Sequence, residues 1–420
     1  MRARSPYRQV LSHGTFRRLL FGQIVSLFGD FLALFAVLDW LAFRQHAGPA
    51  AITMLTFWAL LPLAIFSPLA GALVDRWNVK WTMIGSDAGR AGLIALLLTV
   101  HQISAIYIIF AVMGVLSSAF QPARSVMVKL LVPDEELIAA NGLLQQSVLL
   151  TRVLAMPAAG LLVAAFGSRL CFWADIASFA VSAATVYSIA VPSPVARARK
   201  QAGLLAELGE GLRFLAERPR LAWTVGALGI ALFTSTSMTP LLAVYVRDRL
   251  AAGSLFFGLL SGLVGAGAVV GIQMLPRLRG GRDDSQMVFR GLAVLAGSAL
   301  LLALIRTAIP VGAGAFGIGF GIALVLTPAQ TLLQIQTPLP MLGRVSSTVL
   351  AVISTAQLGG VALSGRWAEA AGVRSVFLGC AALTGVCALF PRFSRASWSG
   401  GSPAAESVRL AEVQRSEQPG

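Results

Sequence analysis

Apolar runs long enough to cross a membrane recur along almost all of this 420-residue chain. Each is about 17 to 25 residues long, the length at which an α-helix crosses the hydrocarbon core of a bilayer. Lipid offers no hydrogen-bond partner to a bare backbone, so such runs must be helical. Only 12% of the residues are charged, whereas a soluble domain carries about 25%. The sequence therefore predicts an all-α membrane protein.

Twelve runs are predicted to span the membrane, in two sets of six. The first set is 19–43, 51–73, 81–100, 104–123, 137–165 and 168–191. The second set is 221–246, 254–275, 286–305, 309–330, 345–367 and 373–390.

These spans divide the chain into five parts. We expect a cytoplasmic N-terminus at 1–18 and six-helix bundles at 19–191 and 221–392. The cytoplasmic linker, 192–220, places leucines on one helical face, which predicts an amphipathic helix. The tail, 393–420, is rich in Ser, Gly, Pro and charge, which is typical of a disordered segment.

Positive charge is divided unevenly between the loops on the two sides of these spans. The termini and the loops on their side hold 23 of the 33 Lys and Arg, and the opposite loops hold 6. Cytoplasmic loops of membrane proteins collect Lys and Arg. We therefore expect both termini to be cytoplasmic, in a multi-pass protein of the cell inner (plasma) membrane.

The two sets of spans also resemble each other in sequence. The stretch "FQPARSVMVKLLVP" at 120–133 matches "LTPAQTLLQIQTP" at 326–338, at the end of the fourth span of each set. Two six-helix halves related as repeats are found in many secondary transporters.

Several motifs resemble the major facilitator superfamily. "GALVDRWNVK" at 71–80 resembles that family's motif between its second and third helices. The stretch "FQPARSVMVKLLVPDEELIAANGLLQ" at 120–145 resembles the drug and siderophore exporter branch, which includes the enterobactin exporter and macrolide efflux proteins. "GQIVSLFGD" at 22–30, "SDAGR" at 86–90, "CFWADIASF" at 171–179 and "GRVSS" at 343–347 fit the same branch.

This resemblance implies the major facilitator fold, with twelve transmembrane helices in two six-helix halves. It also implies a secondary active transporter, a proton-coupled exporter of amphipathic small molecules (drug, macrolide or siderophore) by alternating access. The branch motif contributes Pro122, Ala123, Arg124 and Asn141.

An acidic residue in the turn after the second span is unexpected, because cytoplasmic turns favour Lys and Arg. Asp75 can accept hydrogen bonds from a helix N-terminus of the other half, an interaction favoured by about 0.3–1 kcal/mol. The resemblance implies helix 11, which is expected to start near Gly343 and Arg344. Such a contact would latch the cytoplasmic side; the alternative is a solvated turn. The predicted gating set is Gly71, Asp75, Arg76, Lys80 and Arg344.

Charged residues inside spans are costly and tend to be functional. Asp30 lies in the middle of the first span, and we expect a proton-linked or substrate-linked role. Asp87 and Arg90 lie one turn apart and can form a structural ion pair. Asp175 is either part of the coupling site or a helix anchor. Arg152 can bind an anionic substrate group or pair with Asp30 or Asp175.

No cofactor, metal ion or nucleic acid is expected. Cys171, Cys380 and Cys387 have no CxxC spacing. The chain has no GxSxG or HExxH motif and no phosphate-binding glycine loop followed by Lys and Ser or Thr, so we do not expect an enzyme. The expected partners are a small-molecule substrate, protons and the lipid bilayer, with the protein as a monomer. The alternatives are a lipid flippase, a solute importer on the same fold, or a membrane anchor without transport.

Overall fold

The structure, a computed structural model, describes residues 6–74, 77–190, 204–279 and 284–393. Within these ranges the regular secondary structure is helical throughout. The first half holds α1 (Pro6–Val10), α2 (Gly14–Asp39), the π-helix η1 (Trp40–Arg44), α3 (Pro49–Val74), α4 (Val79–Leu97), α5 (Ile103–Leu131), the 3-10 helix η2 (Asp134–Glu136), α6 (Leu137–Phe166) and α7 (Ser168–Tyr187).

The helix α8 (Leu204–Ala216) lies in the predicted linker and precedes the second half. The second half holds α9 (Pro219–Met238), α10 (Leu241–Arg249), α11 (Ser254–Arg279), α12 (Asp284–Leu304), α13 (Ala308–Gln336), α14 (Leu339–Ala371) and α15 (Val373–Phe393). Of the predicted tail, residues 394–420 lie outside the described ranges.

Ten of the described helices are long and apolar enough to cross a membrane, which confirms the all-α membrane prediction. α4 is absent from this set, and it carries Lys80, Asp87 and Arg90. α15 contributes a shorter apolar stretch, Val373–Leu389. Both helices lie where spans were predicted, but the count of twelve spans stays a prediction.

The fourth span of each half has the same form. α5 and α13 are both 29 residues long and both contain a proline, Pro122 and Pro328. Each is followed by an extended residue and then by a proline, which disfavours helical conformation in the residue before it. The similarity of 120–133 and 326–338 thus coincides with a structural repeat.

Two helices begin or end outside the spans predicted for them. We expected the fourth span to end at 123, but α5 continues to Leu131, so Arg124 lies within it. A proline such as Pro122 is tolerated inside a membrane helix because neighbouring groups satisfy the freed carbonyl. We expected helix 11 to start near Gly343, but α14 starts at Leu339, directly after Pro338. The fixed backbone angle of proline favours a helix start at this point.

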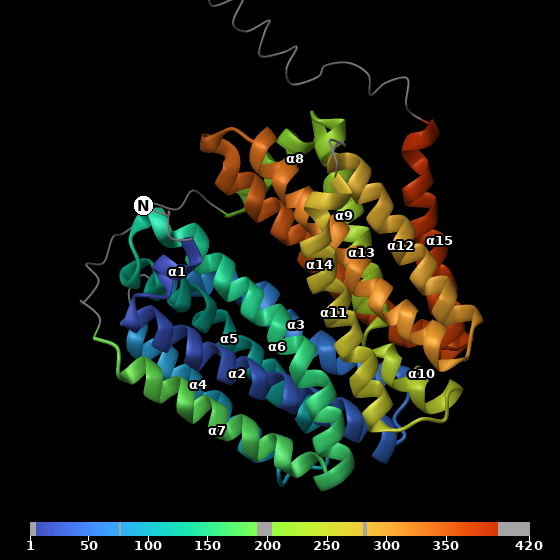
Figure 1. The fold of residues 1–420 in the computed structure, drawn as a ribbon, viewed down its shortest axis with the longest axis horizontal. Coiled ribbons are helices and arrows are strands. Elements are labelled where there is room, and N and C mark those ends of the chain that lie inside the picture. Colours follow the sequence, from blue (N-terminus) through green and yellow to red (C-terminus); the bar gives the residue numbers. More distant parts are fainter. Residues whose placement is uncertain (1–5, 75–76, 191–203, 280–283, 394–420) are drawn as a thin grey trace, which may run out of the picture.

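The elements form two groups in chain order (Figure 1). We call the end of the molecule that carries α1 and α8 the terminal face, and the end that carries the α2–α3, α4–α5 and α6–α7 connections the far face. The groups pack through α6 with α11 and through α3 with α14. Toward the far face, a Cβ on Gly160 would lie 3.1 Å from Gly258 Cα, so these helices almost touch. At the terminal face, α1 and α8 lie apart in Figure 1.

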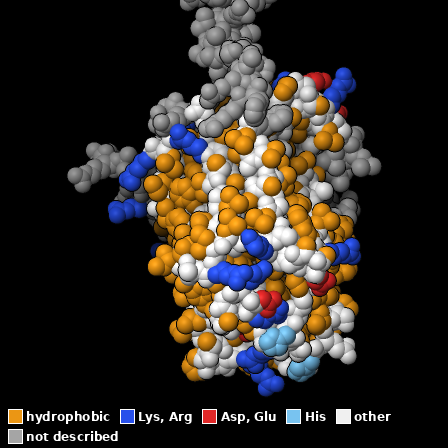
Figure 2. All heavy atoms as spheres, turned by 90° about the vertical axis from the view of Figure 1, so that its right-hand side faces the viewer, with side chains coloured by type: hydrophobic (Ala, Val, Ile, Leu, Met, Phe, Trp, Pro, Cys, Tyr) orange, Lys and Arg blue, Asp and Glu red, His pale blue; other side chains and the backbone are white. Residues whose placement is uncertain are grey.

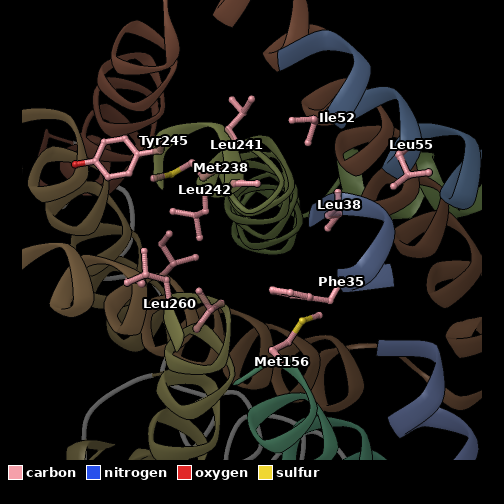
Figure 3. Packing of buried hydrophobic residues seen from close by; sticks show 14 of the residues in the cluster. Phe35, Leu38, Ile52, Leu55, Met156, Met238, Leu241, Leu242, Tyr245 and Leu260 are labelled. Atoms are coloured by element: carbon pink, nitrogen blue, oxygen red, sulfur yellow. The ribbon is translucent and has the colours of Figure 1, made fainter. Parts of the chain in front are cut away.

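An apolar core joins the two halves (Figure 3). Phe35 of α2 stacks on Phe257 of α11, with ring centroids 4.9 Å apart, and both side chains are buried. Met156 and Leu260 belong to the same cluster. Figure 2 shows hydrophobic side chains over much of the outer flank of the molecule, as expected for a surface in contact with lipid.

Candidate functional site

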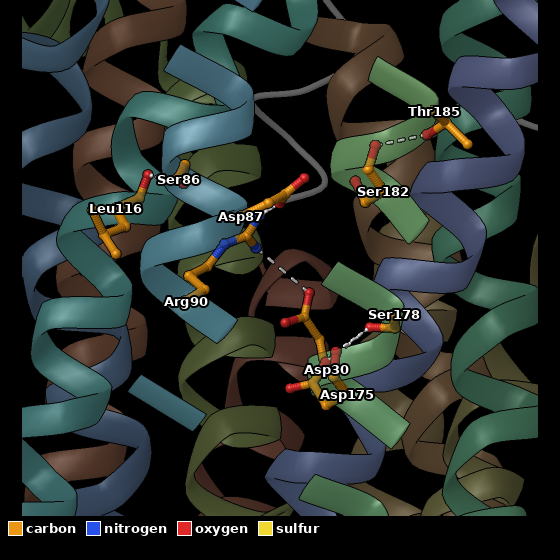
Figure 4. A network of polar contacts seen from close by, with 9 residues as sticks. All are labelled: Asp30, Ser86, Asp87, Arg90, Leu116, Asp175, Ser178, Ser182 and Thr185. Carbon is orange, nitrogen blue, oxygen red and sulfur yellow. Dashed lines mark hydrogen bonds and ion pairs between the residues drawn. The ribbon is translucent and has the colours of Figure 1, made fainter. Parts of the chain in front are cut away.

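Three helices of the first half, α2, α4 and α7, bring four of the predicted intramembrane charges together (Figure 4). These are Asp30, Asp87, Arg90 and Asp175. α2 and α7 approach closely because α2 presents glycines to α7. A Cβ on Gly29 would lie 2.4 Å from Asp175 Oδ1, and a Cβ on Gly22 would lie 2.1 Å from Thr185 Oγ1. Gly29, the residue before Asp30, therefore allows α2 and α7 to pack closely where they carry Asp30 and Asp175.

Arg90 lies at the centre of this cluster. Its Nη2 donates to Asp87 Oδ1 at 2.5 Å, and its Nη1 lies 3.8 Å from Asp30 Oδ2. The guanidinium also faces the rings of Phe120 and Phe179, each centroid 4.6 Å away. Cation–π contacts of this kind favour a charged guanidinium where water is scarce. One arginine thus links the acids of α2 and α4.

The acidic members of the cluster differ in exposure. Asp87 and Asp175 are fully buried, whereas the side chain of Asp30 is 32% exposed. Asp87 Oδ2 and Asp175 Oδ2 have no hydrogen-bond partner among the described residues, although Ser178 donates to Asp175 Oδ1 at 3.1 Å. The guanidinium of Arg90 therefore pairs with two of the three carboxyl groups, Asp87 and Asp30, and leaves Asp175 without an ion pair among the described residues. Buried polar atoms without partners are costly. This arrangement can hold or release a proton, and Asp30 is its most accessible member.

Arg152 lies outside this cluster, on α6. It forms no ion pair with any residue that the structure describes, so neither of the pairings left open by the sequence, with Asp30 or with Asp175, is present. Its Nε is buried and has no partner in the same described set. The residue is half-buried, so its cationic group is available to a bound anion.

The described members of the predicted gating set lie toward the terminal face. Asp75 and Arg76 lie outside the described residues, and Gly71 lies in α3. Lys80 donates to the carbonyl oxygens of Tyr187 and Ile189, at 2.6 and 3.0 Å. It therefore closes the C-terminal end of α7, within its own half.

Arg344 pairs with Glu210 of the linker helix α8. A Cβ on Gly211 would lie 2.8 Å from the Arg344 carbonyl oxygen, so α8 packs directly on α14. In this conformation α14, the predicted partner helix of Asp75, packs against the linker helix α8.

The four residues of the branch motif lie at the terminal ends of α5 and α6. Ala123 is buried, while Pro122 and Arg124 are half-buried in α5. Asn141 is exposed, and its Nδ2 donates to the Leu137 carbonyl oxygen in the first turn of α6. These four residues therefore lie on either side of the connection between α5 and α6, and none of them belongs to the charged cluster.

Sequence reasoning missed Asp39. It ends α2, is 1% exposed, and its Oδ1 has no partner among the described residues. It lies beside Ser254, the first residue of α11 in the other half, and near Arg44. The signal in the sequence was a second acid in the first span, whose burial depends on packing against the other half.

Comparison with known proteins identifies relatives along most of the chain. A model described as the Major Facilitator Superfamily matches residues 19–353. An uncharacterized MFS-type transporter, YfiS of Bacillus subtilis (strain 168), is 27% identical over 383 residues, which cover 87% of this chain and 89% of that protein. Macrolide efflux protein A of Streptococcus pyogenes is 27% identical over 264 residues, which cover 58% of this chain and 65% of the relative.

Solved structures share the architecture at lower sequence identity. The nucleoside transporter NupG superposes with a TM-score of 0.72 at 13% identity, over 90% of this chain and 98% of that one. A bacterial homologue of the iron transporter ferroportin in an inward-facing state gives a TM-score of 0.66 at 17% identity, over 89% and 98% of the two chains. At such identities the likeness shows the fold alone.

Proposed function

Because this chain belongs to the major facilitator superfamily of membrane transporters, we propose that it exports amphipathic small molecules in exchange for protons. It works by alternating access, in which the two halves open first to one side of the membrane and then to the other. In this proposal the protein lies in the inner membrane, with both termini in the cytoplasm. On this orientation the terminal face is cytoplasmic.

The observation that carries the proton coupling is the cluster around Arg90. Asp87 and Asp30 pair with its guanidinium, Asp175 of α7 belongs to the same cluster, and Asp30 alone of the three acids keeps a substantial exposed fraction. An acid in that position can exchange protons with water while its charge state changes the attraction to Arg90. Because Arg90 links α2 with α4, protonation of Asp30 would loosen the contact between these two helices.

Export of an amphipathic compound is supported by two further observations. Three of the curated relatives matched over more than half of this chain are named macrolide efflux protein A. Arg152 offers a cationic group without an ion-pair partner among the described residues, which suits a substrate with an anionic or strongly polar group.

Transport assays in two systems test this proposal. A host that lacks its own drug pumps, expressing the protein, should accumulate less of a macrolide or of a fluorescent dye than the same host with an empty vector. In inverted vesicles that hold an acid interior, adding a transported compound should release protons, and an uncoupler should abolish its accumulation. Accumulation that ignores the uncoupler would remove proton coupling from the proposal.

A lipid flippase or a solute importer on the same fold is the alternative. A flippase would move a fluorescent phospholipid analogue between the leaflets of reconstituted vesicles. An importer would raise, rather than lower, the amount of substrate inside intact cells. The same vesicles and cells therefore separate these functions from export.

A further inference from the structure

A cavity of about 340 Å³ opens at the far face of the first half, away from the charged cluster. It is bounded by the end of α2 with η1, by the α4–α5 connection and by the α6–α7 turn. Three basic side chains line it: Arg44, His101 and Arg169. No acidic residue is among its lining residues in the part of the chain that the structure describes.

The basic residues of this cavity are uncompensated. Arg44, His101 and Arg169 are exposed, and none of them has a hydrogen bond or ion pair with another described residue. Asp39 lies one turn before Arg44, but it is buried and does not line the cavity. Like charges that line one cavity repel each other, and an anion bound there would relieve this repulsion. The cavity therefore favours a negatively charged occupant.

The local backbone places these groups around the cavity. Arg44 ends the π-helix η1, a rare form that is frequent at functional sites. Gly167, with φ of +81°, turns the chain between α6 and α7, and a Cβ there would lie 3.5 Å from Arg44 Nη2. Ser168 then begins α7, so the free N–H groups and positive end of that helix adjoin the same cavity.

The other walls of the cavity are apolar. Trp40, Leu98, Ile106 and Phe172 line it, and so does Phe166, whose side chain is 71% exposed. In a membrane protein an exposed aromatic ring at a helix end lies at the level of lipid headgroups. The cavity thus combines a cationic rim with an apolar wall that is open to lipid.

We infer that this far-face cavity binds a phosphate-bearing anion. Arg44 and Arg169 hold the phosphate oxygens by charge-assisted hydrogen bonds, and the start of α7 adds backbone donors. Two sources carry this chemistry at the far face: the headgroup of an anionic phospholipid and a soluble phosphate. The apolar wall with Phe166 suits a lipid, whose chains would continue along it.

The test uses the full-length protein in nanodiscs of phosphatidylcholine, with or without phosphatidylglycerol. Lipid retained by the protein is measured by native mass spectrometry. In nanodiscs of phosphatidylcholine alone, inorganic phosphate is titrated against the tryptophan fluorescence of the protein, to which Trp40 in the cavity wall contributes. Each basic residue near an anionic surface contributes about fivefold to affinity, so R44Q/R169Q should weaken binding by about 25-fold. The control R306Q/R374Q removes two exposed arginines outside the cavity lining.

Each outcome bears on the inference. If R44Q/R169Q loses retention of phosphatidylglycerol but the control pair does not, a lipid headgroup is supported. If R44Q/R169Q loses the phosphate response but not the lipid, a soluble phosphate is supported. Equal loss in the control pair would reduce the effect to general surface charge and overturn the inference, as would the absence of both kinds of binding in the unmodified protein. If R44Q/R169Q does not fold, the single variant R169Q serves, with an expected loss of about fivefold.

Discussion

At the scale of single residues, the proposed proton coupling rests on the pairing of Asp30 of α2 with Arg90 of α4. Its carboxylate lies 3.8 Å from Arg90, which is bound more tightly to Asp87 at 2.5 Å. Asp87 is buried and has a strong partner, whereas Asp30 is partly exposed and weakly paired. Asp30 is therefore the most accessible of the three acids. Its protonation sacrifices the weaker of the two ion pairs with Arg90.

We expect Asp30→Asn to leave the protein folded but to stop transport against a concentration gradient. Asn keeps the shape of the side chain and removes the titration, so exchange of substrate down its gradient should partly survive. Accumulation in reconstituted vesicles, with and without an uncoupler, measures the difference. Asp30→Glu is the control and should retain some coupled transport. Uncoupler-sensitive accumulation by Asp30→Asn at the normal level would exclude Asp30 as the essential proton site.

Lys80 illustrates how far residue roles could be predicted. The sequence placed it in a gating loop, but the structure shows it bound to the last carbonyls of α7. We expect Lys80→Met to lower the free energy of unfolding by about 1–2 kcal/mol, because two charge-assisted hydrogen bonds at a helix C-terminus are lost. Thermal unfolding in detergent measures this loss. Lys129→Met, at an exposed position, should change it little.

If Lys80→Met unfolds at the normal temperature but transports slowly, the gating role would be favoured instead. The hydrogen bonds to α7 would then be incidental to the function of this residue.

At the scale of helices, glycines set how closely the elements approach. In the second half, a Cβ on Gly319 of α13 would lie 1.7 Å from the Val264 carbonyl oxygen of α11. Because the neighbour is backbone, it cannot rotate away. We expect Gly319→Ala to destabilise the protein by about 1–3 kcal/mol through overpacking. The matched variant Gly297→Ala, whose Cβ meets nothing within 4 Å, should be neutral or stabilising in the same unfolding assay.

The sequence predicted helices better than their contacts. Apolar length alone gave the positions of the spans, and the turn-by-turn spacing of Asp87 and Arg90 indicated that they could pair. The contact of Arg90 with Asp30 could not be predicted, because it depends on how α2 and α4 are rotated about their axes. For the same reason Asp39 was missed, since its burial requires α11 from the other half.

At the scale of the whole molecule, the proposed orientation rests on charge alone. In the predicted twelve-span topology, the side that holds the termini has 23 of the 33 Lys and Arg, against 6 on the other side. We expect a tag after Gly420 to be reached only from the cytoplasm, and a tag inserted near Gly253 only from outside. Labelling of intact cells with a membrane-impermeant thiol reagent measures both. A tail labelled from outside would contradict the twelve-span topology.

The predicted latch at the terminal face remains a proposal, because Asp75 lies outside the described residues. We expect Asp75→Asn to slow transport while expression stays near normal. The closed cytoplasmic state would lose about 1–2 kcal/mol, which shifts a balanced two-state equilibrium roughly tenfold. Transport rates at several substrate concentrations measure the effect, with Asp75→Glu as control. Normal rates at every concentration would eliminate the latch.

The charged cluster also has an electrical consequence. In the predicted twelve-span topology, three carboxyl groups and one guanidinium would lie within the membrane, all on helices of the first half. Each proton taken up changes the net charge of that half by one, and a transmembrane potential of 100 mV does about 2.3 kcal/mol of work on each elementary charge moved across it. The potential would therefore pull on one half of the molecule and not equally on the other. Voltage, as well as a difference in pH, would then drive the rocking motion.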